Sequence, residues 1–432
     1  MLESRHLRPR TARPDLAMRS LLIECRRLLS ERGAANSVAI AQSLVARFNA
    51  LTDDQQGTFF ERLSSDFGPK PQLVLTCAQA YAAAPNASNL QQLLRQVEPP
   101  RQELLRRINR LPGGTSSIVA MRQALLERLN RKPELRAVEA DFLHLLSSWF
   151  NPGFLQLTRV DWNSPAQLLE KIIQHEAVHA IDGWSDLRRR LQPDRRCFAF
   201  FHPQLPQEPL IFVEVALLAK MPAAIAPLIG QESSPTAPKD FKVAAFYSIS
   251  NCEPGLRGVS MGNFLIKRVA MELQRELPQV RTFCTLSPIP GFARWVRSGA
   301  ICTGAPKARE DRLRCAHQLL LKRLGVDPEA LSSATALRSL PSAVAEALLC
   351  LGANFLVGES ATPEGDPVAS FHLDNGARLE QLSLLGDLSG KGIRQSFGLM
   401  VNYLYDLNKV EGHHEKFSRG EIAHSRAIAA LL

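Results

Sequence analysis

The spacing of apolar residues changes near residue 151, and this change limits the chain to a fold with two different parts. Before it, apolar residues recur at helical spacing, as they do over residues 104–111. Proline and glycine pairs at 99–100 and 113–114 separate such segments. The pattern predicts an all-α helical bundle over residues 1–150. This part contains no metal-ligand cluster and no phosphate loop, so we expect it to serve packing and oligomerisation.

After residue 151, short apolar runs bounded by proline or glycine alternate with amphipathic segments. Strands are expected over 196–201, 209–218, 242–250 and 280–286, and as a pair around the turn at 374–376. Helices are expected over 164–178, 263–276 and 309–350, and from about residue 392. This mixed order is typical of an α+β domain over residues 151–432. A chain of 432 residues is also too long for one ordinary core, so two domains are expected.

The net charge and the cysteines limit the partners and the compartment. The formal charge of +10 and the pI of about 9.4 favour an anionic partner, such as nucleic acid, anionic lipid or a polyphosphate ligand like coenzyme A. We find no apolar run of the roughly 18 residues that a membrane helix needs, so no membrane association is expected. The eight cysteines form no CxxC pair, and we see no secretory signal, so we expect reduced thiols in a cytoplasmic protein. The arginine-rich N-terminus resembles a transit peptide only weakly.

A glycine-rich segment, Gly255 to Gly262, lies between a predicted strand and a predicted helix. Glycines there let the backbone approach a ligand, and exposed amides at a helix N-terminus favour phosphate. The segment is neither a Walker loop nor a dinucleotide fingerprint, because its glycine spacing differs from both. Its Arg-Gly-x-x-x-Gly order resembles the pyrophosphate loop of the GCN5-related N-acetyltransferase fold, with one extra residue. The alternative is a tight turn in which the glycines only relieve strain.

Two proton-handling side chains stand at the ends of expected strands. Ser287 ends an apolar run and precedes two prolines and a glycine, and His372 precedes an Asp-Asn-Gly turn. Such side chains on rigid elements indicate an active site more than a core. The alternatives are an ordinary turn serine and a structural histidine.

The segment His175-Glu176-Ala177-Val178-His179 matches the H-E-x-x-H zinc motif on an expected helix. The longer zinc motifs need a glycine at position 182 and a histidine at position 185, where the chain has Asp182 and Ser185. A run of arginines and then strands follows, with no later helical glutamate. We therefore do not expect a metal site here.

Several ordered blocks between about residues 153 and 405 resemble the malonyl-CoA decarboxylase family. These blocks are Gly153-Phe154-Leu155, Arg159-Val160-Asp161-Trp162, Glu176-Ala177-Val178-His179 with Trp184, Arg195-Arg196-Cys197, Glu208-Pro209-Leu210, Phe246-Tyr247-Ser248-Ile249-Ser250, Phe264 to Val269, Leu286 to Phe292, Phe371-His372-Leu373 with Asn375-Gly376, and Gly398 to Tyr403. A long ordered series of this kind is more specific than any single motif.

The resemblance implies the conversion of malonyl-CoA to acetyl-CoA and carbon dioxide, without metal, biotin or pyridoxal. It implies a helical bundle followed by an acetyltransferase-like mixed domain, and a homo-oligomer (dimer or tetramer) formed through the N-terminal helices. Ser287 matches the family's catalytic serine and His372 matches the donor of a proton to the α-carbon. An imidazole with an ordinary pKa near 6.5 would be partly protonated at neutral pH. The coenzyme A loop corresponds to Arg257, Gly258, Val259, Ser260, Met261, Gly262 and Asn263.

One position departs from the family. Animal members tend to carry an acidic residue where this chain has Ser260, so its role is open. Open too are the roles of Glu176, which would orient the site or only cap a helix, and of His179. Asn402 would pack or would bind the thioester oxygen with its amide.

Three other functions compete with the decarboxylase. An N-acyltransferase of the same fold would transfer its acyl group to an amine and would not need the Ser287 and His372 pair. A zinc hydrolase would use His175 and His179. A scaffold or nucleic-acid binder would fit the charge, but the basic residues are spread along the chain without the interleaved aromatic residues of a stacking platform.

Overall fold

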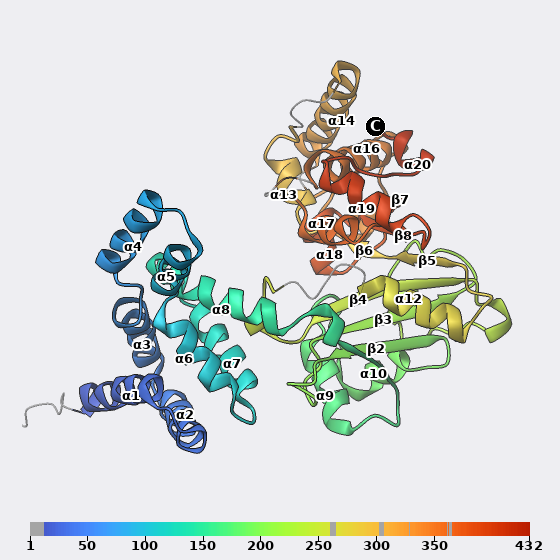
Figure 1. Ribbon diagram of the computed structural model, residues 1–432. Coiled ribbons are helices and arrows are strands. Elements are labelled where there is room, and N and C mark those ends of the chain that lie inside the picture. Colours follow the sequence, from blue (N-terminus) through green and yellow to red (C-terminus); the bar gives the residue numbers. More distant parts are fainter. Residues whose placement is uncertain (1–12, 260–264, 302–305, 328, 361, 363–364) are drawn as a thin grey trace, which may run out of the picture. The chain divides into compact units, whose positions relative to one another are not determined.

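The computed structural model describes residues 13–259, 265–301, 306–327, 329–360, 362 and 365–432. The chain forms two compact units, which are described separately. The first consists of Met1–Leu155, His202–Glu208 and Glu253–Met261, and the second of Gln156–Phe201, Pro209–Cys252 and Gly262–Leu432. The first is helical and the second combines a sheet with helices (Figure 1), so the predicted α+β class is confirmed.

The first unit is built from α-helices. They are α1 (Arg13–Ser30), α2 (Ala34–Asn49), α3 (Asp53–Asp66), α4 (Pro71–Ala83), α5 (Ala87–Val97), α6 (Pro100–Asn109), α7 (Gly114–Leu126) and α8 (Arg136–Trp149). Local chemistry sets their ends; for example, Thr52 and Gln55 form a reciprocal capping box at the start of α3. Phe48, Phe59 and Phe60 pack edge to face in the core of the unit.

The segment from Glu253 to Val259 packs on α7 in this first unit, through the short 3-10 helix η4 (Pro254–Leu256). The buried Arg122 donates hydrogen bonds to the carbonyl oxygens of Gly255 (2.7 Å) and Arg257 (2.8 Å), and it pairs with Glu139 at 2.7 Å. A Cβ atom at Gly255 would lie 2.1 Å from the carbonyl oxygen of Val119, so only glycine allows this close approach.

The second unit contains a sheet of eight described strands. They are β1 (Gln156–Val160), β2 (Arg195–Phe201), β3 (Ile211–Leu218), β4 (Val243–Asn251), β5 (Thr282–Thr285), β6 (Ser287–Pro288), β7 (Arg378–Ser383) and β8 (Met400–Tyr405). Their order is β1-β2-β3-β4-β5-β8-β6, and β7 also pairs with β8. Neighbours are antiparallel except β4 and β5, which are parallel. The connection between these two includes α12 (Leu265–Glu276), as a parallel pair requires.

The parallel pair separates part-way along its length. β4 pairs with β5 only from Val243 to Phe246, and the last bond joins the Leu286 amide to the Phe246 carbonyl at 3.0 Å. The next residue, Ser287, pairs with Val401 of β8 instead. The rest of β4, from Tyr247 to Asn251, therefore has no partner on this side among the described residues. A gap between two parallel strands is the part of the fold that positions the site.

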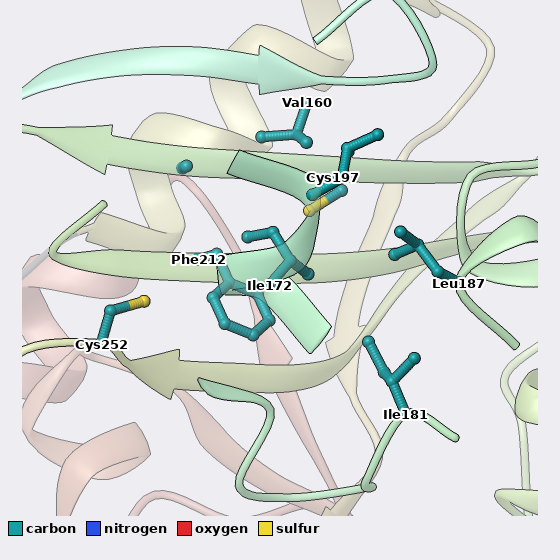
Figure 2. Close-up of a cluster of buried hydrophobic side chains, with 9 residues drawn as sticks. Val160, Ile172, Ile181, Leu187, Cys197, Phe212 and Cys252 are labelled. Carbon is teal, nitrogen blue, oxygen red and sulfur yellow. The ribbon is translucent and has the colours of Figure 1, made fainter. Parts of the chain in front are cut away.

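Helices cover both faces of the sheet. On one face, α9 (Ala166–His175) and α10 (Gly183–Arg190) contribute Ile172 and Leu187 to a buried cluster with β-strand residues such as Phe212 (Figure 2). On the other face, α12 places Arg268 over the ring of Phe200, 5.4 Å from its centroid. With both faces covered, β2 and β3 are buried almost throughout, which explains their continuous apolar sequences.

The C-terminal part differs from the sequence expectation. Residues 367–374 form a helix, α17 (Pro367–Asp374), and not the first strand of a hairpin. Asp366 caps this helix and proline stands in its first turn, two signals that favour a helix over a strand here. The expected last helix is the short α18 (Gly390–Ser396), and β8 follows it. The remaining α-helices are α11 (Ala226–Ile229), α13 (Phe292–Arg297), α14 (Lys307–Val326), α15 (Ala334–Arg338), α16 (Ser342–Glu359), α19 (Val410–Ser418) and α20 (Arg426–Ala429).

Helix α16 corrects a second expectation, that no apolar segment has the length of a membrane span. Ser342–Glu359 is long and apolar enough by length and composition, and half of it is buried inside the structure. A core helix has the same properties, and α16 buries Leu348, Leu351 and Phe355. It packs on α13 and α14, which is the behaviour of a core helix.

Candidate active site

A cavity of about 320 Å³ lies in the second unit where β4 leaves β5. It is lined by Val178, Ile211, Phe246, Tyr247, Ser248, Ile249, Asn251, Ser287, Pro288, Pro367, Val368, Phe371 and His372. The volume is within the range of small-molecule sites. Most of the wall is apolar, and none of these lining residues carries a permanent charge. The cavity therefore suits an acyl group that reacts away from water.

Ser287 reaches this cavity because it is the first residue of β6, just after the strands separate. Its side chain is 5% exposed. Its Oγ donates to Thr285 Oγ1 at 2.9 Å and lies 3.1 Å from His372 Nε2. Thr285 Oγ1 also accepts the amide of Tyr403 at 3.2 Å, so the serine is held on the sheet from two sides.

His372 enters the cavity from α17, and not from a strand as expected. Its Nδ1 lies 2.9 Å from the hydroxyl of Tyr405. Its ring stacks on Tyr403, with 4.6 Å between centroids and 29° between planes. The two tyrosines are alternate residues of β8. The structure therefore brings the predicted pair, Ser287 and His372, together, and it adds a phenol on the far side of the imidazole.

The hydrogen bonds assign the proton on the imidazole. Burial raises the pKa of Tyr405 well above its ordinary value, so the phenol stays protonated. Its O–H donates a hydrogen bond to Nδ1 of His372. The imidazole proton is then on Nε2, facing Ser287 Oγ. This order agrees with Ser287 donating onward to Thr285.

The charge state of His372 corrects the sequence expectation. Burial lowers the pKa of the imidazole from 6.5 to about 3, because the charged form loses its hydration. Without a ligand the ring is neutral at neutral pH, and not partly protonated. The sequence does not show that this histidine is buried, and burial is the cause of its low pKa.

Asn402 does not offer its amide to a ligand. Its Nδ2 donates to the carbonyl oxygens of Thr285 (2.8 Å) and Pro222 (3.0 Å). Both amide protons are thus used to hold β8 to its surroundings, and the suggested bond to a thioester oxygen is unsupported. Its Oδ1 is buried and has no hydrogen-bond partner among the described residues.

The H-E-x-x-H segment is not a helical metal motif. Helix α9 ends at His175, so His179 does not lie one turn further along it. Among the described residues, no group of three or more histidine, cysteine or acidic side chains could hold a metal ion. Burial lowers the pKa of His179 to about 4, and Asp387 opposes this shift.

Glu176 is a buried structural acceptor. Its carboxylate accepts the hydroxyl of Ser248 at 2.8 and 2.6 Å, and the amides of Val178 and His179 at 2.8 Å each. Lys391 of α18 holds the same loop through the carbonyl of Val178 at 3.1 Å. Ser248 and Val178 line the cavity and Glu176 does not, so Glu176 holds two lining residues in place without facing the cavity.

The predicted coenzyme A residues fall in two groups. Arg257, Gly258 and Val259 belong to the first unit, where Gly258 has a φ of 80°, a conformation that favours glycine. Ser260, Met261, Gly262 and Asn263 lie outside the described residues. The coenzyme A part of the site therefore stays a prediction.

Sequence reasoning missed three residues that surround the pair. Thr285 is two residues before Ser287 in extended chain, so it could have been found by strand alternation. Tyr405 required recognition of β8, where Tyr403 and Tyr405 also alternate. Asp366 carried an N-cap signal, but its contact across 75 residues to the Gly291 amide carried none.

Comparison with known proteins gives consistent matches over both parts of the chain. The profile described as malonyl-CoA decarboxylase C-terminal domain matches residues 153–432, and that of the N-terminal domain matches residues 67–150. The chain is 35% identical to mouse (Mus musculus) mitochondrial malonyl-CoA decarboxylase over 406 residues, which are 88% of this chain and 82% of the mouse protein. It is 38% identical to the goose (Anser anser anser) mitochondrial malonyl-CoA decarboxylase over 331 residues, 72% of this chain and 65% of the goose protein.

A solved structure agrees with these matches. The crystal structure of malonyl-CoA decarboxylase from Rhodopseudomonas palustris superposes with a TM-score of 0.85 at 47% identity, and covers 96% of this chain and 99% of that chain.

The buried His372 predicts a pH-dependent stability. The unfolded chain binds a proton near pH 6.5 and the folded chain only near pH 3, so the unfolded state binds more protons between these values. The free energy of unfolding should therefore decrease as the pH falls from 6.5, by up to about 1.4 kcal/mol per pH unit. His372→Asn should remove this contribution, measured as the unfolding midpoint between pH 7 and 4.5.

The matched control is His144→Asn, because His144 is exposed. Its midpoint should follow the wild type at every pH. Parallel curves for the wild type and His372→Asn would contradict the low pKa of His372.

Proposed function

The chain belongs to the malonyl-CoA decarboxylase family, and we propose that it converts malonyl-CoA to acetyl-CoA and carbon dioxide in the cavity of Ser287 and His372. The observation that carries the site assignment is the 3.1 Å contact between these two side chains on a mostly apolar wall. The enzyme is a carboxy-lyase. The bond between the α-carbon and the free carboxylate breaks, carbon dioxide leaves, and the electron pair remains as the enolate of the thioester. A proton then binds the α-carbon.

The apolar wall favours the first step. The malonyl carboxylate is a localised charge, whereas the enolate spreads its charge over carbon and oxygen and carbon dioxide is neutral. A wall made of Val178, Ile249, Phe371 and their neighbours hydrates the localised charge poorly. Moving from water into this cavity therefore costs the carboxylate more than the delocalised transition state.

Ser287 is proposed to stabilise negative charge. Its hydroxyl donates to Thr285 in the free protein, so only a rotation about the Cβ–Oγ bond is needed to direct the proton into the cavity. There it would bind the malonyl carboxylate and then the developing enolate oxygen. The amide of Tyr403, which donates to Thr285 Oγ1 at 3.2 Å, ties the strand that presents Ser287 to β8 independently of the serine hydroxyl.

His372 is proposed to donate the proton to the α-carbon. A neutral imidazole is too weak an acid for this role. The imidazole must therefore take up a proton from solution when the substrate binds. The negative malonyl group, which enters beside Nε2, attracts the protonated imidazole and so raises its pKa. The carboxylate is then the counter-ion of the imidazolium. The Tyr405 hydroxyl is both donor and acceptor, so it can accept Nδ1–H once the ring is charged. The positive imidazolium faces one negative charge throughout the reaction, first on the malonyl carboxylate and then on the enolate.

The loop from Arg257 to Asn263 is proposed to bind the coenzyme A diphosphate. Gly258 has a left-handed backbone, as glycines in phosphate-binding loops often do, and backbone amides are the groups that bind phosphate in such loops. Arg122 supports this role by fixing the carbonyls of Gly255 and Arg257.

We also propose that residues 151–432 form the catalytic domain and that the helical domain, residues 1–150, forms a homo-oligomer. Helices α4 and α5 contain no buried residue, although α5 is strongly amphipathic. Their exposed apolar residues are Leu73, Leu75, Leu90, Leu94 and Val97. Such a hairpin gains little from its own packing and is expected to be covered by the hairpin of a second copy.

The remaining proposals concern location and other partners. We propose a cytoplasmic enzyme, because the cysteines in the described part of the chain form no disulfide with one another. The curated relatives are mitochondrial by name. No nucleic acid and no membrane is proposed as a partner.

The central test is acetyl-CoA formation from malonyl-CoA in the presence of a chelator. The wild type should be active, His372→Asn should lose about 10²- to 10⁴-fold in kcat, and Ser287→Ala about 10²-fold. His175→Asn is the matched control and should keep wild-type turnover, because His175 does not line the cavity. If the chelator alone abolished activity, the result would favour a zinc-dependent enzyme that uses His175 and His179. If the folded wild type were inactive on malonyl-CoA, the result would favour the N-acyltransferase.

Substitution of Arg122 tests the coenzyme A loop. Arg122→Met keeps most of the buried volume but leaves the carbonyls of Gly255 and Arg257 without their donor. We expect the KM for malonyl-CoA to rise about tenfold, with a smaller change in kcat. Arg128→Met is the control, since Arg128 pairs with Asp53 in the same unit and does not bond to the loop. Equal effects of the two variants on KM would contradict the role of the loop.

Substitution in the α4–α5 hairpin tests the oligomer. The double variant Leu90→Glu with Leu94→Glu should reduce the mass measured by light scattering to that of a smaller assembly, with helix content unchanged. Leu321→Glu is the control, because Leu321 is 52% exposed on α14 in the other unit. An unchanged mass of the double variant would exclude the hairpin as the interface.

A further inference from the structure

Asp366 bonds to both segments that carry the proposed active-site pair. It is 1% exposed and lies at the N-cap of α17, six residues before His372. Its Oδ1 accepts the amides of Val368 (2.9 Å) and Ala369 (3.0 Å). Its Oδ2 accepts the amide of Gly291 at 3.1 Å, in the rigid turn that follows Ser287. One carboxylate thus joins the helix of the histidine to the loop of the serine.

A helix cap alone does not require this residue. Three other helices of the same unit, α15, α18 and α20, are capped by serines, each of which accepts a single amide. A buried carboxylate costs more than a buried hydroxyl, because it loses the hydration of a charge. No ion pair between Asp366 and a cationic side chain occurs among the described residues. The second oxygen, which bonds to Gly291, is what distinguishes aspartate from serine here.

The surroundings agree with a constrained position. Burial raises the pKa of Asp366, and the amides of Ala369, Gly291 and Val368 oppose this shift. A Cβ at Gly291 would lie 3.1 Å from the ring of Phe355 and 3.7 Å from Asp366 Oδ2, so the turn is tightly packed against the phenylalanine and in ordinary contact with the carboxylate. Hydrogen bonds from amides to a charged acceptor are stronger than those between neutral groups, so one carboxylate can hold the two segments against each other.

We propose that Asp366 is a positioning residue that sets the distance between Ser287 and His372. This inference rests on the proposed roles of those two side chains. Asp366 itself is not among the residues that line the cavity. It acts by holding the start of α17 against the turn at Gly291, so that Nε2 faces Ser287 Oγ at 3.1 Å. A displacement of about 1 Å between such groups can cost up to 10²-fold in rate.

The test compares Asp366→Ala with Asp366→Ser. Alanine removes the cap and the bond to Gly291, whereas serine restores the cap of α17 but has no second oxygen for Gly291. We expect Asp366→Ser to recover most of the melting temperature lost in Asp366→Ala. Its kcat should remain about 10- to 100-fold below the wild type, with KM little changed. Ser333→Ala, which removes the cap of α15, is the control and should lower stability without this loss of kcat.

The second arm places Asp366→Ser in the His372→Asn background. If Asp366 acts through His372, the double variant should be less than about twofold slower than His372→Asn alone. Asp366→Ser with wild-type kcat, or with the full loss repeated in the His372→Asn background, would overturn the positioning role while leaving the proposed function intact. Wild-type turnover in His372→Asn would instead overturn the assigned proton donor, and the positioning role with it.

Discussion

The separation of two parallel strands is the constraint on which the rest of the site depends. β4 and β5 share hydrogen bonds only as far as Phe246, and the chain after Leu286 turns to β8. Parallel strands without a shared ladder leave backbone groups and side chains facing a gap, and here the gap is the cavity. Ser287 is the first residue beyond the separation, so its position follows from the point at which pairing stops. β8 then serves two purposes, because it replaces β4 as the partner of the chain and carries the tyrosines that hold the imidazole.

The apolar surroundings of His372 affect both its charge state in the free enzyme and the binding of an anionic substrate. The same apolar surroundings that weaken the hydration of a malonyl carboxylate also keep His372 neutral until a negative ligand arrives. In the proposed mechanism the malonyl carboxylate and a proton enter together without net charge, which a cavity lined by no permanently charged residue accepts more easily than either ion alone. The hydroxyl of Tyr405 suits this arrangement because it can reverse its hydrogen bond when the ring charge changes.

The sequence predicted a helical part followed by a mixed α+β part, and most of the strands between residues 195 and 251. It also pointed to Ser287 and His372, which the structure brings to 3.1 Å from each other and whose catalytic roles are proposals. The strands were visible because burial on both faces makes them continuously apolar. The helix α17 was wrongly expected to be a strand, since a short apolar segment before an Asn-Gly turn fits both structures. The neutral state of His372 and the contact of Asp366 with Gly291 depend on residues distant in the chain, and local pattern carries no information about them. Arg122 was also invisible, because its partners are backbone carbonyls that any residue would offer.

The packing of residues 253–259 on α7 also bears on how such a chain can be divided. The covalent order assigns this segment to the C-terminal half, but its carbonyls are held by Arg122 and its tight approach is to Val119. A gene fragment that begins after the helices would encode the loop without the surface that shapes it. The two halves are thus separate in sequence profile but not independent as folding modules, and an exchange of helical parts between relatives would need to carry Val119, Arg122 and Gly255 as one set.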